Sequence, residues 1–298
     1  MTWISDDVVS RLRAVTDEPE TTGTRYRIVR EIGRGGMGVV YEAEDAELDR
    51  RVAFKVLASE LTGGAEKLRD EARIMARLEH PGIVPLHDAG VLPDGRVFYV
   101  MKLVRGRRLD DFGRDTHASS EVLRVFLRIC EAVAFAHARG VVHCDLKPEN
   151  VMLGELGEVL VMDWGIARAA GRSSDDRVIA GTRGFMAPEQ ERGDVGSIDA
   201  STDVYALGAI LCALLSNAPK PLAAVIAKAT SPDRSQRYAN AKELADDIAR
   251  YLDDAPLVAY RATPVERGLK WLSRNSAVIT VVVAYLIMRT IFFLWVRR

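Results

Sequence analysis

The hydrophobic pattern divides the chain into a strand-rich part and a helix-rich part. Between residues 26 and 103, short β-branched or alternating apolar runs are separated by turn sequences such as Pro93-Asp94-Gly95. Such runs are typical of β-strands. One amphipathic helix is predicted after the third strand, from apolar residues at helical spacing between 68 and 78. The pattern predicts five strands, over 26–33, 39–43, 51–57, 84–91 and 97–103.

Beyond Gly106 the apolar spacing becomes mainly helical. Long helices are predicted over 121–138, 203–215 and 241–252. The second of these is apolar on almost every side, so we expect it to be buried. Residues 1–24 are polar and lack a sustained apolar period, which indicates a linker. The chain is therefore predicted to be an α+β protein with a strand-rich lobe followed by a helical lobe.

The last apolar run, residues 277–296, has the length of a membrane span. Its 20 residues would extend about 30 Å as a helix. Arg289 disfavours insertion by about 2.5 to 3.5 kcal/mol. Twelve Val, Ile, Leu and Phe residues outweigh that cost at roughly 0.3 to 0.6 kcal/mol each. We therefore expect a C-terminal transmembrane helix, the alternative being a helix that docks on the domain.

The basic residues that flank this run predict its orientation. Four precede it in a linker over 254–276, and only two follow it. Because basic residues favour the cytoplasmic side, the large N-terminal part is predicted to be cytoplasmic. This predicts a single-pass protein of the cell (inner) membrane. The four preceding residues are Arg261, Arg267, Lys270 and Arg274, and the two that follow are Arg297 and Arg298.

Composition narrows the classes of function. The 298 residues include 41 Lys and Arg against 42 Asp and Glu, so the formal charge is −1 and gives no reason to expect nucleic acid as a partner. The three cysteines, Cys130, Cys144 and Cys212, form no CxxC pair. This disfavours a zinc cluster or a disulfide framework.

A glycine-rich run lies between the first two predicted strands. It reads Ile32-Gly33-Arg34-Gly35-Gly36-Met37-Gly38-Val39-Val40, a GxGxxGxV pattern. An ordinary hairpin is the alternative explanation. The run leads into a strand and not a helix, which argues against a dinucleotide fold and favours a flexible cover over phosphates. Lys55 follows on an apolar strand and Glu71 on the predicted helix. A buried lysine needs a partner, and this carboxylate is the expected one.

Three further motifs follow in a fixed order. They are His143-Cys144-Asp145-Leu146-Lys147-Pro148-Glu149-Asn150, Asp163-Trp164-Gly165 and Ala187-Pro188-Glu189. Together with the glycine-rich run they resemble the protein kinase family, in particular the bacterial receptor-like (Hanks-type) serine/threonine kinases. The resemblance extends from about residue 26 to 252. It implies the bilobal kinase fold, with a five-stranded sheet and one helix in the N-lobe and a mainly helical C-lobe.

The resemblance also implies domain boundaries and cofactors. The kinase domain would cover 25–253, with an N-lobe over 25–101, a hinge over 102–105 and a C-lobe over 106–253. ATP and Mg²⁺ would be bound between the lobes, and a protein with Ser or Thr hydroxyls would be the substrate. A homodimer is one arrangement that the sequence leaves open.

Individual roles are carried over onto the matching residues. Asp145 would accept the proton of the attacking hydroxyl, and Lys147 would face the γ-phosphate. Lys55, held by Glu71, would grip the α- and β-phosphates. Asn150 and Asp163 would hold the metal. Asp203 would brace the catalytic loop and Arg237 would pair with Glu189, both in structural roles. The nucleotide would also contact Ile32, Gly33, Arg34, Gly35, Gly36, Met37, Gly38, Val39, Val40, Met101 and Leu103.

Two departures from the family pattern affect regulation and substrate docking. Cys144 stands where most members have an arginine that receives the phosphorylated activation loop, so phosphate-driven activation is not expected. Only residues 216–231 separate two predicted C-lobe segments. That interval is too short for both the helix that helps dock substrates in the family and the helix after it.

Three functions are compatible with these motifs. The first is a membrane-anchored serine/threonine protein kinase. The second is a membrane-anchored pseudokinase that acts as a scaffold, and the third is a kinase of small molecules. The enzyme is favoured over the scaffold because Lys55, Asp145, Asn150 and Asp163 are all present. Gly181-Thr182 and Ala187-Pro188-Glu189 resemble a peptide-binding loop and count against a small-molecule substrate.

Overall fold

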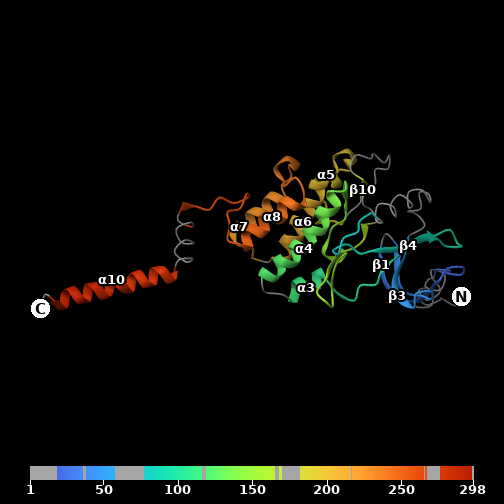
Figure 1. Ribbon diagram of the computed structural model, residues 1–298. Coiled ribbons are helices and arrows are strands. Elements are labelled where there is room, and N and C mark those ends of the chain that lie inside the picture. The colour runs from blue at the N-terminus through green and yellow to red at the C-terminus, as the bar shows by residue number, and fades with distance from the viewer. Residues whose placement is uncertain are drawn as a thin grey trace, which may run out of the picture.

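The computed structural model shows two lobes joined by a short connection, with a long helix beyond them (Figure 1). It describes residues 19–35, 38–57, 77–115, 119–164, 168–169, 182–215, 217–264, 266 and 276–296. Glu71, Gly36 and Met37 lie outside the described residues, as does most of the amphipathic helix predicted between 68 and 78.

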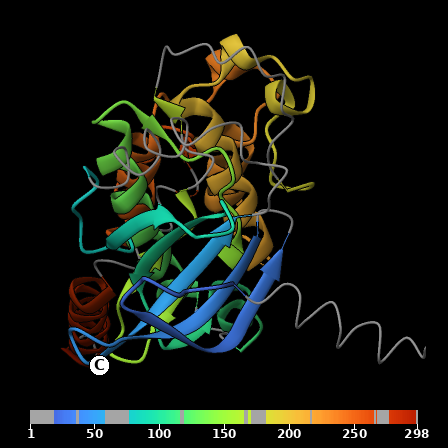
Figure 2. The same ribbon diagram turned by 90° about the vertical axis from the view of Figure 1, so that its right-hand side faces the viewer.

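The N-lobe is an antiparallel sheet of five strands in the order β1-β2-β3-β5-β4. Figure 2 shows this sheet below the helices of the second lobe. The prediction of five strands is confirmed. The strands are β1 (Tyr26–Gly35), β2 (Gly38–Asp45), β3 (Arg50–Leu57), β4 (Leu86–Val91) and β5 (Val97–Lys102).

Alternation along β3 gives the sheet two different faces. Val52, Phe54 and Val56 point to one face, where the Phe54 ring stacks on that of Phe98 with centroids 4.6 Å apart. Successive side chains of a strand point to opposite faces. Ala53 and Lys55 therefore face the other way, and both are buried. This second face is the side of the sheet that contributes to the site described below.

The C-lobe packs its helices around one apolar core. The predicted helices over 121–138, 203–215 and 241–252 are observed as α4, α6 and α8, and Val204, Leu207 and Leu211 of α6 are fully buried. The helices are α3 (Leu109–Asp115), α4 (Ser119–His137), α5 (Pro188–Glu191), α6 (Ala200–Leu214), α7 (Lys220–Ala229) and α8 (Ala241–Leu252), with 3₁₀ turns η2 (Pro148–Asn150), η4 (Val195–Ser197) and η5 (Arg234–Gln236).

Short strands in the C-lobe were not predicted from the sequence. β6 (Gly106–Arg108), β8 (Val151–Gly154) and β9 (Val159–Val161) form one small sheet, and β7 (Val141–Val142) pairs with β10 (Arg168–Ala169). These strands have two to four residues. Runs this short carry too little periodicity to be recognised.

The interval between α6 and η5 is as short as the sequence suggested. Within the described residues 217–231 it holds α7 as its one helix. α7 packs its buried Leu222 and Val225 into the C-lobe core. The expectation that 216–231 cannot hold two helices is therefore confirmed for the described residues.

The last helix, α10 (Ser276–Val296), lies away from both lobes in Figure 1. The predicted helix over 277–296 is confirmed as a helix. The prediction that it spans a membrane is corrected: across the described parts of the chain, no helix combines the length and apolar character that crossing a bilayer requires.

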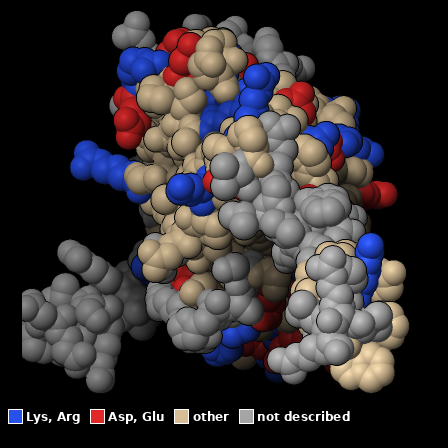
Figure 3. Space-filling view, turned by 90° about the vertical axis from the view of Figure 1, so that its left-hand side faces the viewer, with Lys and Arg blue, Asp and Glu red and all other residues tan. Residues whose placement is uncertain are grey.

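The balanced charge of the sequence is also visible on the surface. On the face shown in Figure 3, Lys and Arg side chains lie intermixed with Asp and Glu side chains among uncharged residues. Opposite charges at such spacing cancel at short range. This face therefore has no extended field of one sign among its described residues.

Candidate active site

An ion pair between a buried lysine and a partly exposed aspartate joins the two lobes. Lys55, on β3, is 4% exposed, and its Nζ lies 2.5 Å from Oδ1 of Asp163. Asp163 follows β9 and has a left-handed backbone with φ of 59°. An ammonium group in an apolar strand is costly unless it is paired. Asp163 supplies that partner here, while Glu71, the partner expected from the sequence, lies outside the described residues.

The segment before Asp145 is fixed by a carboxylate from α6. Asp203 accepts hydrogen bonds from the backbone N–H groups of His143, at 2.8 Å, and Cys144, at 2.9 Å. His137 Nε2 bonds the same carboxylate at 2.8 Å. Burial alone would raise the pKa of Asp203, but these hydrogen bonds and the nearby histidines lower it. The predicted bracing role of Asp203 is therefore confirmed.

Asp145 is the centre of a compact polar group. Its Oδ1 accepts a hydrogen bond from Thr182 Oγ1 at 3.0 Å, and its Oδ2 lies 3.1 Å from Lys147 Nζ. Lys147 Nζ also donates to Thr182 Oγ1 at 2.7 Å. Asn150 Nδ2 donates to the Asp145 backbone carbonyl at 2.8 Å. The structure thus brings together Asp145, Lys147 and Asn150, as the sequence predicted, and adds Thr182 to them.

Asn150 and Asp163 lie on two backbone segments that are joined by a hydrogen bond. The backbone N–H of Met162 donates to the Asn150 carbonyl at 2.8 Å, so Asp163 is the residue next to this contact. Carboxylate and amide oxygens are ligands that suit Mg²⁺, which takes one or two protein carboxylates and completes its shell with phosphates and water. No cluster of three His, Cys, Asp or Glu side chains suited to a metal occurs among the described residues. The two-residue donor set fits Mg²⁺ held jointly with a nucleotide.

An apolar cluster lies between the sheet and the connection to the C-lobe. At its centre are the buried residues Ala53, Val84 and Met101. Around them pack Val40, Leu103, Val104 and Met162. Three of the predicted nucleotide contacts therefore meet in one place. These side chains offer an apolar surface at this point of the fold.

The glycine-rich run forms the end of β1 and the start of β2. Gly38 is confined to glycine, because its φ is 136° and a Cβ there would lie 2.0 Å from the carbonyl oxygen of Val56. A Cβ on Gly33 or Gly35 would meet nothing within 4 Å. Those two positions therefore border open space, as a cover over a ligand requires.

The other predicted residues of the run lie beside these glycines. Ile32 is 37% exposed on β1. Arg34 pairs with Glu31 at 2.8 Å. Val39 lies on β2, opposite Val56 of β3.

A fully buried ion pair fixes the Ala187-Pro188-Glu189 motif. Arg237 donates from Nη1 and Nη2 to the two carboxylate oxygens of Glu189, at 2.7 and 2.9 Å. Both side chains are fully buried, and Thr202 Oγ1 also donates to Glu189. The predicted pairing of Arg237 with Glu189 is confirmed. The motif Ala187-Pro188-Glu189 is thereby anchored to α6 and to the segment after η5.

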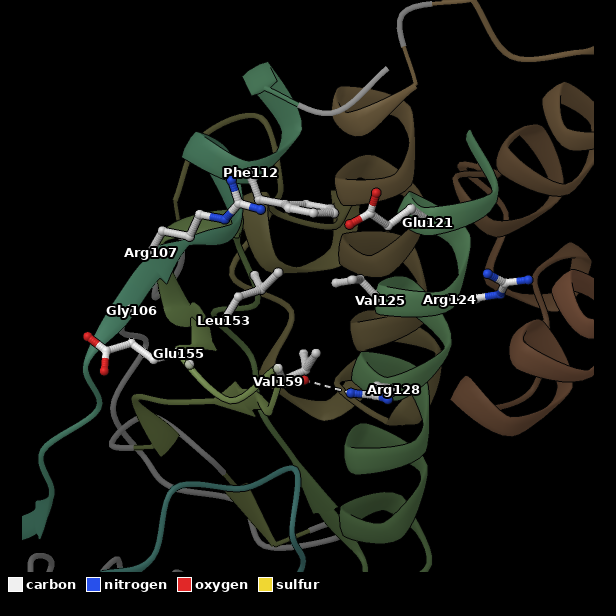
Figure 4. Close-up of a pocket in the computed structure, with 12 residues that line it drawn as sticks. Gly106, Arg107, Phe112, Glu121, Arg124, Val125, Arg128, Leu153, Glu155 and Val159 are labelled. Carbon is white, nitrogen blue, oxygen red and sulfur yellow. Dashed lines mark hydrogen bonds between the residues drawn. The ribbon is translucent and has the colours of Figure 1, made fainter. Parts of the chain in front are cut away.

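A hollow lies elsewhere in the C-lobe. This cavity, of about 600 Å³, is bounded by β6, α3, α4 and the β8–β9 turn. Its floor includes Phe112, Val125 and Leu153 (Figure 4). Arg128, on its edge, donates to the carbonyl of Gly157 at 2.7 Å. None of the predicted site residues lines it, so this hollow is separate from the predicted site.

Several residues of the site were missed by sequence reasoning. Ala53, Val84 and Met162 complete the apolar cluster, and Thr182, which was assigned to the peptide-binding loop, contacts Asp145 directly. Ala53 and Met162 each lie within two residues of a predicted site residue, Lys55 and Asp163. That proximity was the available signal. Val84 carries no such signal, because only the fold brings it to Met101.

The comparisons with known proteins agree with this geometry. Residues 26–249 match the family model described as protein kinase domain. The chain is 31% identical to the serine/threonine-protein kinase PknD of Protochlamydia amoebophila, covering 76% of this chain and 30% of that protein. It is 34% identical to the probable serine/threonine-protein kinase PknB of Lactococcus lactis, covering 76% and 42%. The chain therefore spans about a third to two fifths of the length of these relatives.

Solved structures show the same fold. The crystal structure of the Mycobacterium tuberculosis PknI kinase domain is 25% identical, with a TM-score of 0.62, and the match covers 79% of this chain and all of that one. A second structure of that kinase domain is 27% identical, with a TM-score of 0.60 and coverage of 76% and 95%.

Proposed function

We propose that this chain, which belongs to the protein kinase family, is a serine/threonine kinase that transfers the γ-phosphate of ATP to a protein hydroxyl. The observation that carries the proposal is the group formed by Asp145, Lys147 and Thr182 beside the Lys55–Asp163 pair. Phosphoryl transfer requires positioning and charge neutralisation more than covalent chemistry. These residues offer cations and carboxylates at one place.

The nucleotide would lie between the two lobes. Its adenine ring would enter the apolar cluster of Val40, Ala53, Val84, Met101 and Leu103, which offers dispersion contacts and excludes water. The glycine-rich strands would cover the phosphates. Met101 and Leu103, as predicted from the sequence, would then contact the base and not the phosphates.

Lys55 would bind the phosphates. Its ammonium now faces Asp163, and a bound nucleotide would offer it phosphate oxygens in addition. Asn150 and Asp163 would hold Mg²⁺, which when bound neutralises charge on the phosphates. Glu71 remains the proposed second partner of Lys55.

Asp145 would orient the attacking hydroxyl and accept its proton. The Asp145 carboxylate is 4% exposed and is held by contacts on both oxygens, so its orientation is defined before a substrate arrives. Lys147, 3.1 Å from that carboxylate, would stabilise the negative charge on the transferred phosphoryl group. The hydroxyl of Ser or Thr is the acceptor we propose.

The geometry favours an active enzyme over a pseudokinase scaffold. A scaffold has no need to keep Lys55, Asp145, Asn150 and Asp163 together, yet Asp145 bonds Asn150 and Lys55 bonds Asp163. A small-molecule substrate is disfavoured by Thr182 and the anchored Glu189. These two residues belong to a loop that would lie beside a bound peptide.

The direct test is transfer of labelled phosphate from ATP with Mg²⁺ to a generic basic protein substrate. Lys55→Met and Asp163→Asn should each abolish transfer with the fold intact, because both remove charge from the phosphate and metal cradle. Circular dichroism and thermal unfolding would establish the fold. If both variants keep more than about a tenth of the wild-type kcat, a loss below about 1.4 kcal/mol, another apparatus is responsible.

Membrane attachment is a separate proposal. Large apolar side chains of α10 are exposed, among them Met288 at 64% and Trp295 at 74%. Exposed apolar surface of this kind favours burial in another phase or partner, and the basic residues of 254–276 favour an anionic membrane surface. Fractionation of the full chain and of a chain ending at residue 275 tests this. Equal recovery of both in the soluble fraction would rule it out.

A further inference from the structure

The backbone of Cys144, the residue before Asp145, has an unusual conformation. Its φ is 68°, in the left-handed region that non-glycine residues seldom occupy. A residue in this region persists only when its surroundings hold it there. The direction in which Asp145 leaves this residue depends on that conformation. Whatever fixes Cys144 therefore helps to aim the Asp145 carboxylate.

Two side chains form hydrogen bonds with the backbone of Cys144, one with its N–H group and one with its carbonyl. On one side its backbone N–H donates to Asp203 Oδ1 at 2.9 Å. On the other side its carbonyl oxygen accepts a hydrogen bond from Gln190 Nε2 at 2.7 Å. The amide of Gln190 is used at both ends, because its Oε1 accepts from the backbone N–H of Ala187 at 3.1 Å. Gln190 is 4% exposed, so water cannot easily replace these contacts.

Gln190 follows a residue whose side chain is held by several hydrogen bonds. Its neighbour Glu189 is held by two hydrogen bonds from Arg237 and one from Thr202. Asp203, which holds the other side of Cys144, lies one residue after Thr202 in α6. The peptide-binding loop and the catalytic loop are thus joined through groups that carry no phosphate.

We propose that Gln190 is a positioning residue that holds the catalytic loop in the conformation in which Asp145 can act. The proposal rests on the proposed kinase function. A purely local role is the alternative, because Oε1 of Gln190 caps the first turn of α5. The two roles use different atoms: Oε1 serves the cap, and Nε2 serves the catalytic loop.

Gln190→Glu separates them. An ionised glutamate keeps an oxygen for the cap but loses the donor to the Cys144 carbonyl. We expect kcat to fall at least tenfold, with the KM for ATP within threefold of wild type and the melting temperature within a few degrees. Gln236→Glu is the matched control, since Gln236 is exposed on η5, and it should leave all three unchanged. A kcat of Gln190→Glu within twofold of wild type would overturn the proposal, as would a loss of activity that only follows loss of folded protein.

A second variant tests the backbone conformation itself. Glycine adopts a φ near 68° without strain. Cys144→Gly should therefore depend less on the hydrogen bond from Gln190 to hold this conformation. The effect of Gln190→Glu should therefore be smaller in the Cys144→Gly background. There kcat should fall at least threefold less, relative to Cys144→Gly alone, than it falls relative to wild type. An equal fall in both backgrounds would contradict the mechanism.

Amide hydrogen exchange tests the positioning role of Gln190 without a measurement of activity. Gln190→Glu should speed exchange of the amides of residues 143–147 in the full chain, and Gln236→Glu should not. If the wild type proved inactive, the proposed function would fail, while faster exchange would still show that Gln190 positions this loop. Unchanged exchange would reject the positioning role in either case.

Discussion

Asp247 of α8 accepts a hydrogen bond on Oδ1 from the backbone N–H of Val258, at 2.7 Å, eleven residues further along the chain. Its Oδ2 accepts from the N–H of Ala259, at 2.9 Å, and from the hydroxyl of Tyr238, at 2.8 Å. The carboxylate is fully buried. The match to the protein kinase domain ends at residue 249. Asp247 therefore attaches to the C-lobe a segment that lies beyond the matched region.

Asp247→Asn should destabilise the protein. One of its oxygens becomes an NH₂ group, which cannot accept, so a buried donor loses its partner at a cost of about 1 to 3 kcal/mol. The melting temperature should fall by about 2 to 4 °C per kcal/mol. Asp246→Asn is the matched control, because the Asp246 side chain is 48% exposed and pairs with Lys242 one turn away, so its effect should stay below about 0.5 kcal/mol. Equal losses in the two variants would show that the contacts to Val258 and Ala259 contribute nothing.

Stability should also decline in acid. Burial would raise the pKa of Asp247, but hydrogen bonds from Val258, Ala259 and Tyr238 lower it overall. Burial also acts to raise the pKa values of Glu189 and Asp203, but Arg237 lowers that of Glu189 and His137 lowers that of Asp203. A carboxyl whose folded pKa is depressed stabilises the fold above its unfolded pKa, about 4, and loses that contribution as the pH falls through the folded value.

Urea unfolding between pH 7 and pH 3 would measure this decline. Titration of these carboxylates should change the free energy of unfolding little down to about pH 5. Below that pH the free energy of unfolding should fall steeply. The difference between wild type and Asp247→Asn should shrink as the pH falls. A constant difference across this range would mean that the carboxylate charge of Asp247 is not what stabilises the fold.

The sequence predicted those parts of the molecule that depend on local patterns. Strands β1–β5 and helices α4, α6 and α8 each follow from apolar spacing, and Asp145, Lys147 and Asn150 from one continuous motif. Contacts between distant segments could not be predicted in this way. Asp247 is one example, because Asp246 and Asp247 are adjacent acidic residues and only the path of residues 258–259 makes one of them buried. Gln190 is another, since its second partner is 46 residues away.

The hydroxyl of Thr182 should contribute to catalysis. It receives a hydrogen bond from Lys147 and donates one to Asp145. Thr182→Val keeps the size of the side chain and removes both bonds, so kcat should fall about tenfold, or about 1.4 kcal/mol. Thr182→Ser keeps the hydroxyl and serves as the control, with kcat within threefold of wild type. An equal loss in Thr182→Ser, which keeps the hydroxyl, would show that the hydroxyl bonds alone do not account for the effect.

The last prediction concerns activation by phosphorylation. In kinases with an arginine before the catalytic aspartate, a phosphate on the activation loop forms charge-assisted hydrogen bonds with it and orders the loop. Cys144 holds that position here, and its buried thiol faces the carbonyl of Val142 at 3.6 Å. A neutral thiol cannot make those bonds. Hydroxyls that could carry such a phosphate are those of Ser173, Ser174 and Thr182, of which Ser173 and Ser174 lie outside the described residues.

Activity should therefore depend little on phosphorylation of the loop. The kcat/KM values of phosphatase-treated and autophosphorylated enzyme should agree within about threefold, and the double variant Ser173→Ala, Ser174→Ala should match them. The contacts that join Thr182 to Asp145 and Gln190 to Cys144 are already formed without a phosphate, so phosphorylation has little left to order. A tenfold drop on dephosphorylation, about 1.4 kcal/mol, would mean that another cation receives the phosphate. Arg168 and Arg172, which flank the segment before these serines, would then be the first residues to replace.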